Sequence, residues 1–79
     1  MARAEPGERP AGAVGQRVRI QEVDPVTGRV AFVGPQGVRR VVTPQNPAVA
    51  DFARRLRPRD EVDMTYAESV AVSVERADR

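Results

Sequence analysis

The 79-residue sequence predicts a small all-β domain with one short helix. Valine is the commonest aliphatic residue in the chain, and valine favours strands. Several short runs alternate apolar with polar residues, and turns rich in proline and glycine separate them. One stretch after residue 45 instead repeats its apolar residues with a helical period.

The first predicted strand covers residues 14–23, where valine and isoleucine alternate with arginine and glutamine. The alternation slips near the end of this run, which predicts a β-bulge at Gln21–Glu22. The next segment, Asp24–Gly28, is predicted to turn. Pro25 fixes its φ angle there, and Gly28 can adopt a positive φ.

A second and a third strand are predicted at residues 29–33 and 38–43. Between them lies Gly34-Pro35-Gln36-Gly37, a sequence typical of a hairpin turn. Three strands joined by short turns form a meander, which needs further pairing to be stable.

The pattern then changes to that of a helix. Asn46 is a good N-cap, and Pro47 suits the first helical position, where its missing N–H costs nothing. Pro58 is expected to end the helix, and Arg54 and Arg55 near that end match the helix dipole. One apolar stripe runs along the helix: Val49, Phe52, Ala53 and Leu56.

Two more strands are predicted, at residues 61–66 and 70–75, with Ala67-Glu68-Ser69 as the turn between them. The order is therefore three strands, one helix and two strands. A five-stranded barrel with its helix between strands three and four is the OB arrangement, so we expect an OB-like small β-barrel. An SH3-like barrel is the alternative, but that fold does not normally place a helix there.

Composition divides the chain into three parts. Residues 1–13 have no large apolar side chain after Met1 and no period, so they are predicted to be a disordered leader. Residues 14–75 form the single predicted domain, and residues 76–79 form a charged tail. The chain has no Cys and no His, which excludes a disulfide and a zinc site.

Charge and hydropathy exclude few partners. The 13 basic residues are all Arg, and 11 acidic residues reduce the net charge to +2. No apolar run is long enough to predict a transmembrane helix, and the first residues do not resemble a signal peptide. We expect a monomer or a weak dimer formed through a strand edge.

Several segments together resemble a known family. They are Val23-Asp24-Pro25, residues 30–37, Asp51-Phe52, Asp60-Glu61-Val62 and residues 66–72. From Val18 to Val74 the chain resembles a family of small, mostly uncharacterised bacterial proteins that are commonly exported. Arg59 stands where the family pattern has Gly, so this turn is expected to differ in shape. The resemblance implies a β-barrel and a periplasmic or envelope location, with a cytoplasmic location as the alternative.

The order of elements is also similar to that of periplasmic copper chaperones built on an OB barrel. Those proteins bind Cu(I) through His, Met and Trp. This chain has no His and no Trp, and its only internal methionine is Met64. Soft metals need sulfur or imidazole ligands, so we expect no metal and no cofactor.

No catalytic constellation is present, so we expect a protein that is not an enzyme. The serine and threonine hydroxyls have no His or Lys to act as their base. The acidic groups at 22–24 and 60–63 lack a glycine-spaced calcium loop and are expected to form a solvated or salt-bridged rim. Glu68 shares parity with Met64 and Tyr66, so it is either at a hairpin tip or a buried, functional acid.

Arginine carries the candidate binding surface. OB barrels often bind single-stranded nucleic acid across strands two and three, through basic residues and stacking aromatic rings. The residues that would do so are Arg17, Arg19, Arg29, Arg39 and Arg40. The three aromatic residues have core positions, however, and the acidic residues dilute the positive field. We therefore expect a non-enzymatic binding or accessory module with an unknown protein partner, and the alternative is a nucleic-acid-binding OB domain.

Overall fold

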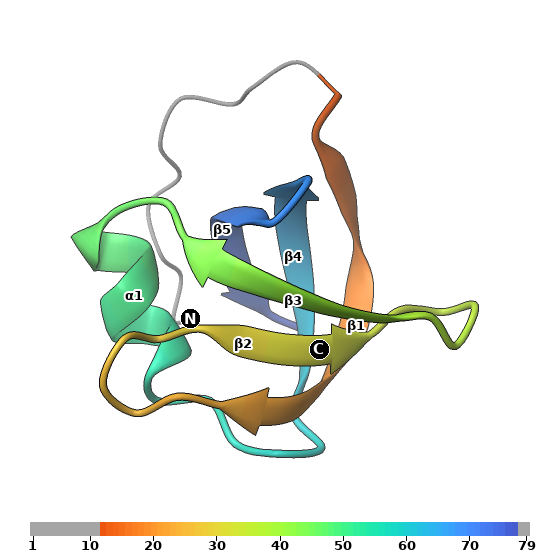
Figure 1. The fold of residues 1–79 in the computed structure, drawn as a ribbon. Helices are drawn as coiled ribbons and strands as arrows, with labels where there is room; N and C mark the ends of the chain where they lie inside the picture. Colours follow the sequence, from red (N-terminus) through yellow and green to blue (C-terminus); the bar gives the residue numbers. More distant parts are fainter. Residues whose placement is uncertain (1–11, 78–79) are drawn as a thin grey trace.

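The structure is a computed structural model that describes residues 12–77. Five strands form one sheet: β1 (Val14–Val23), β2 (Val30–Val33), β3 (Arg39–Pro44), β4 (Glu61–Ala67) and β5 (Val70–Arg76). One helix, α1 (Pro47–Ala53), lies between β3 and β4 (Figure 1). The predicted order of strands and helix is confirmed. Most of the predicted leader and the last two residues of the predicted tail lie outside the described residues.

The sheet closes on itself in the order β1-β2-β3-β5-β4. Four of its contacts are antiparallel, and β4 pairs back to β1 over six residue pairs. The fifth contact, between β3 and β5, is parallel and consists of only two pairs, Thr43 with Val70 and Pro44 with Ala71. The closure therefore depends on one short contact.

Two irregularities curve the strands. The register between β1 and β2 shifts between Ile20 and Glu22, which confirms the predicted bulge. A second shift leaves Val72 without an opposite residue on β4. This second bulge corrects the predicted alternation of β5, because Ala71 and Val72 are both buried and Val70 is only partly so.

Helix α1 begins as predicted and ends earlier. The Val49 N–H donates to Oδ1 of Asn46 at 3.0 Å, so Asn46 is the N-cap. The helix ends at Ala53, and a hydrogen bond between residues three apart follows it: the Leu56 N–H donates to the carbonyl of Ala53 at 3.0 Å. Leu56 lies past the helix but is still buried, at 4% exposure. The apolar stripe thus continues into the loop without helical geometry.

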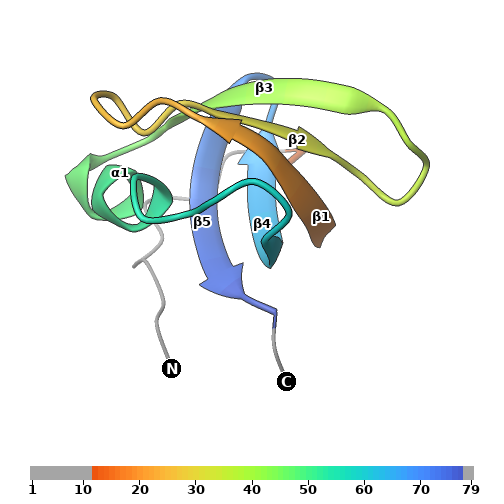
Figure 2. The same ribbon diagram turned by 90° about the horizontal axis from the view of Figure 1, so that it is seen from below.

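The core fills the space inside the closed sheet. It includes Ile20, Phe32 and Met64, all at most 1% exposed. The helix packs against β3 and β5 and covers one end of the sheet (Figure 2). Its Val49, Phe52 and Ala53 belong to the same buried cluster as the strands. Burial of these side chains is the main favourable contribution to folding.

Two turns near α1 have unusual backbone conformations. Gly28 has φ +81°, and a Cβ atom there would lie 3.0 Å from the carbonyl oxygen of Ala50 in the helix. Arg59 also has φ 81°, a left-handed conformation that favours glycine. The turn at Arg59 therefore has a backbone conformation that glycine adopts more readily than arginine.

Candidate binding surface

The outer face of β1, β2 and β3 carries two rows of side chains. In one row, Val33 lies between Arg19 and Arg39. In the other, Ala31 lies between Glu22 and Val41. Residues that face each other across antiparallel strands lie on the same face of the sheet. The centre of this face is therefore apolar, and charged side chains flank it.

Three of the five predicted arginines on this face pair with acidic side chains. Arg17 lies 3.3 Å from Asp63, and Arg19 lies 3.5 Å from Glu61. Arg39 lies 3.7 Å from Glu22, and its Nε donates to Gln21 at 3.0 Å. More than half of each arginine side chain is exposed, so these pairs contribute little to stability. Their effect is to neutralise much of the positive charge.

Of the other two predicted arginines, Arg29 lines the same surface pocket as Arg39, whereas Arg40 lies on the opposite face of β3. Arg29 follows the turn after β1, and its backbone N–H donates to the Thr27 hydroxyl at 3.1 Å. Arg40 faces Phe32 across the sheet and so points to the inner side of β3. Its guanidinium carbon lies 5.6 Å from the centre of the Tyr66 ring. The five arginines therefore do not form one patch.

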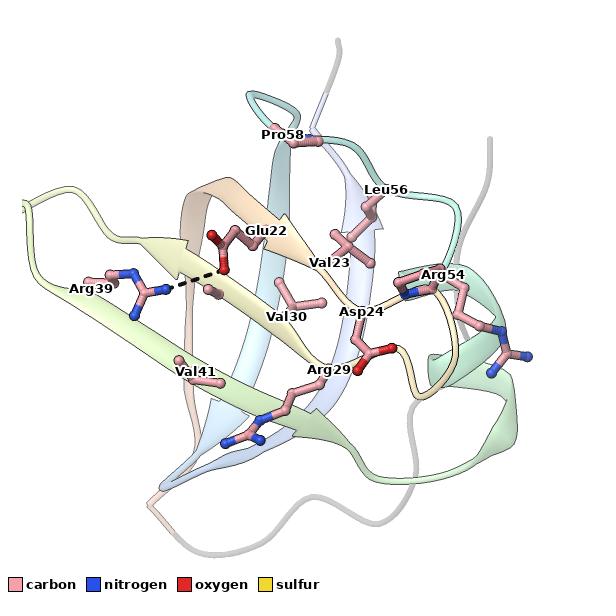
Figure 3. A pocket seen from close by; sticks show the side chains of 12 residues that line it. Glu22, Val23, Asp24, Arg29, Val30, Arg39, Val41, Arg54, Leu56 and Pro58 are labelled. Carbon is pink, nitrogen blue, oxygen red and sulfur yellow. Dashed lines mark ion pairs between the residues drawn. The ribbon is translucent and has the colours of Figure 1, made fainter.

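A groove of about 790 Å³ crosses the outer face and continues to the loop after α1 (Figure 3). Its floor is mostly apolar and includes Val23, Ala31, Val41, Leu56 and Pro58. Its rim is charged and includes Glu22, Asp24, Arg29, Arg39 and Arg54. Sequence reasoning found Arg29 and Arg39 but missed the floor, because the loop after α1 reaches this face only through tertiary contacts. The Arg59 N–H, for example, donates to the carbonyl of Ile20 at 2.7 Å.

All three aromatic residues of the chain are buried. Phe32 is 0% exposed, Tyr66 6% and Phe52 9%. The Phe32 and Tyr66 rings contact each other, with their centres 5.2 Å apart. No aromatic ring is therefore available on the outer face to stack with a nucleic-acid base.

The end of the sheet opposite α1 has a recess of about 210 Å³, which we call the hairpin end. Gln16 and Tyr66 meet there, and the Gln16 Nε2 group donates to the Tyr66 hydroxyl at 3.0 Å. Arg40 lies beside them. Val14 and Val38, which are 46% and 55% exposed, also line this recess. The hairpin end thus combines polar groups with exposed apolar side chains.

Glu68 lies at the tip of the β4–β5 hairpin and is exposed. Its φ of 55° is left-handed, as the sharp reversal of the chain requires. The alternative of a buried acid is therefore wrong: within residues 12–77, no polar or charged residue is buried. The chain turns before Glu68 could continue the alternation of β4.

Asp24 stabilises the turn after β1. Its Oδ1 accepts the backbone N–H groups of Val26 at 2.8 Å and Thr27 at 3.2 Å. These two hydrogen bonds lower the pKa of the Asp24 carboxyl below its ordinary value of 3.8, because they stabilise the charged form. This pKa shift has a structural cause and does not indicate catalysis.

Among the residues that the structure describes, no three acidic side chains come close enough to hold a metal ion. No helix in the same part of the chain is long and apolar enough to cross a membrane. Comparison with protein-family models, with curated proteins and with solved structures finds no significant match to this chain.

Proposed function

We propose that this chain is a non-enzymatic binding module built on a barrel of the OB type. Three features support the OB assignment: the closed strand order, the parallel contact between β3 and β5, and the helix between β3 and β4. The module binds a segment of a partner protein in the groove across β1, β2 and β3.

The observation that carries this proposal is the groove itself. Its apolar floor suits aliphatic side chains of a partner, and its charged rim suits polar groups at the edge of an interface. The rim charges are of both signs, and Glu22 pairs with Arg39 across it. A surface of this kind favours a protein partner over a uniformly negative polymer.

The test needs a groove variant and a matched control. Val41→Arg places a long charged side chain on the floor of the groove, whereas Val26→Arg changes a residue that is 78% exposed in the turn after β1. A partner captured with the wild-type protein is purified, and its Kd is measured for all three proteins. We expect binding at least tenfold weaker for Val41→Arg and an unchanged Kd for Val26→Arg. An unchanged Kd for Val41→Arg would reject the groove.

Binding of single-stranded nucleic acid is the second proposal. Arg29 and Arg39 favour it, because both line the groove: Arg39 lies on β3 and Arg29 directly precedes β2, the two strands that OB proteins use for nucleic acids. The buried aromatic rings and the paired arginines oppose it. An amide NMR titration with a mixed-sequence oligonucleotide tests it. Shifts on β2 and β3 that weaken as salt rises would support nucleic-acid binding.

A periplasmic or envelope location remains a proposal that rests on the family resemblance. Fractionation of cells that express the natural gene tests it. Recovery of the protein with the cytoplasmic fraction would reject it.

A further inference from the structure

Strand β3 has a free edge. On one side, residues 39–42 pair with β2 along their whole length. On the other side, the contact with β5 begins only at Thr43. Among residues 12–77, no strand pairs with Arg39–Val42 on this second side. Unpaired strand edges are places where another extended chain can add.

Two backbone hydrogen bonds show which groups face the free edge. The Thr43 N–H donates to the carbonyl of Ser69 at 2.7 Å, on the β5 side. The Gly34 N–H donates to the carbonyl of Val38 at 3.2 Å, on the β2 side. Successive residues of a strand point their N–H and C=O groups to opposite sides. Arg39 and Val41 therefore point both groups away from β2. Four backbone groups are thus arranged to pair with an added strand.

The side chain of Arg40 indicates the chemistry of that strand. It lies on the inner side of β3 at the hairpin end, beside Tyr66. Arg17, Arg19 and Arg39 each have an acidic partner, whereas Arg40 has none within the described part of the chain. The Tyr66 oxygen accepts a hydrogen bond from Gln16, so its own proton remains to be donated. A carboxylate opposite Arg40 would meet both donors.

A second copy of this chain fits this edge poorly. Two β3 strands paired antiparallel through the outward groups of Arg39 and Val41 would place the Arg40 side chains of the two copies opposite each other, and like charges in such positions destabilise a sheet. An acidic peptide has the complementary charge. We infer that the free edge of β3 binds an extended peptide segment that carries an acidic side chain opposite Arg40.

This inference rests on the proposed function as a protein-binding module, and it names the binding mode and the chemistry of the partner. Val41 belongs to both the groove floor and the edge, whereas Arg40 belongs only to the edge, so Arg40→Gln separates the two proposals. A partner that binds weakly to Val41→Arg but normally to Arg40→Gln would leave the groove proposal standing and reject the edge.

The experiment uses a blocked octapeptide of alternating valine and glutamate, titrated into the full chain and followed by amide NMR. We expect shifts at Arg39–Val41 and Tyr66, and slower hydrogen exchange of the Arg39 and Val41 amides. The matched probe replaces each glutamate with lysine and should bind at least tenfold more weakly. Equal binding of the two peptides, or no binding of the glutamate peptide at millimolar concentration, would overturn the inference.

Two variants separate backbone pairing from charge. Val41→Pro removes an N–H that faces the free edge and leaves the bonds to β2 in place. Arg40→Gln removes the charge, and Arg55→Gln changes an exposed arginine after α1 as the control. We expect at least tenfold weaker binding of the glutamate peptide for the first two and no change for the third. Unchanged binding for Val41→Pro would reject strand addition, and shifts of β3 amides with protein concentration alone would indicate self-pairing instead.

Discussion

The two ends of the closed sheet are built differently. The helix end is covered by α1, whose Val49 and Ala53 are at most 1% exposed and whose Phe52 is 9% exposed. Among residues 12–77, no helix covers the hairpin end, and Gln16, Arg40 and Tyr66 meet there beside two exposed valines. The helix end is arranged for stability, whereas the hairpin end leaves polar groups and a strand edge open to a ligand. Substitutions at the two ends should therefore differ in the size of their effect on stability.

The largest expected effect is at the helix end. Phe52→Ala removes a large side chain from the core and should destabilise the protein by about 3–5 kcal/mol. The denaturation midpoint measures this loss, and Phe52→Leu serves as the control because it retains most of the volume. A midpoint that does not change in Phe52→Ala would show that α1 does not seal this end.

Two glycines compare the ends directly. Gly28 and Gly37 share φ +81°, but only at Gly28 would an added Cβ atom lie close to the helix. Gly28→Ala should cost about 2–4 kcal/mol, because backbone strain and overlap with Ala50 add together. Gly37→Ala meets no atom within 4 Å and should cost only about 1 kcal/mol. Equal losses of stability would mean that contact with the helix is unimportant.

At the hairpin end, Tyr66→Phe removes the hydroxyl that accepts from Gln16. The expected loss is about 0.5–1.5 kcal/mol, the usual net contribution of one hydrogen bond. A double-mutant cycle with Gln16→Ala isolates this interaction. Additive losses in the cycle would show that the two side chains are not coupled.

Replacing either of two residues with positive φ by glycine should stabilise the protein. Arg59→Gly relieves a left-handed conformation near the helix end, and Glu68→Gly does so at the β4–β5 tip. The strain of about 1–2 kcal/mol exceeds the extra entropy that glycine gains in the unfolded chain, so each should add up to about 1 kcal/mol. Thermal unfolding of both variants measures this gain. A lower Tm for Arg59→Gly would show that its side chain has a role of its own.

The smallest effect is the pH dependence of Asp24. Because its pKa is lowered in the folded protein, the stability that it contributes is present above pH 3.8 and is lost as pH falls below that value. The difference in midpoint between wild type and Asp24→Ala should therefore shrink below pH 3.8. If this difference in midpoint stays constant with pH, the hydrogen bonds to the Asp24 carboxylate do not cause the loss of stability in Asp24→Ala.

Local features of the chain could be predicted from the sequence because neighbouring residues determine them. Asn46 and Pro47 start the helix, the turn at Asp24–Gly28 reverses the chain, and the bulge near Gln21–Glu22 follows from the slipped alternation. Each of these depends on hydrogen bonds and backbone preferences within a few residues. The apolar stripe predicted the buried face of the helix for the same reason, although Leu56 lies past its end.

Only the tertiary structure decided what lies together on the surface. Ion pairs such as Arg17 with Asp63 join residues far apart in the chain, because strand register determines which side chains face each other. The short contact between β3 and β5 leaves the edge at Arg39–Val42 open, and the hairpin turn places Glu68 at an exposed tip. A sequence pattern shows the period of an element but not its neighbours. The binding surface, which consists of neighbours, therefore required the closed sheet.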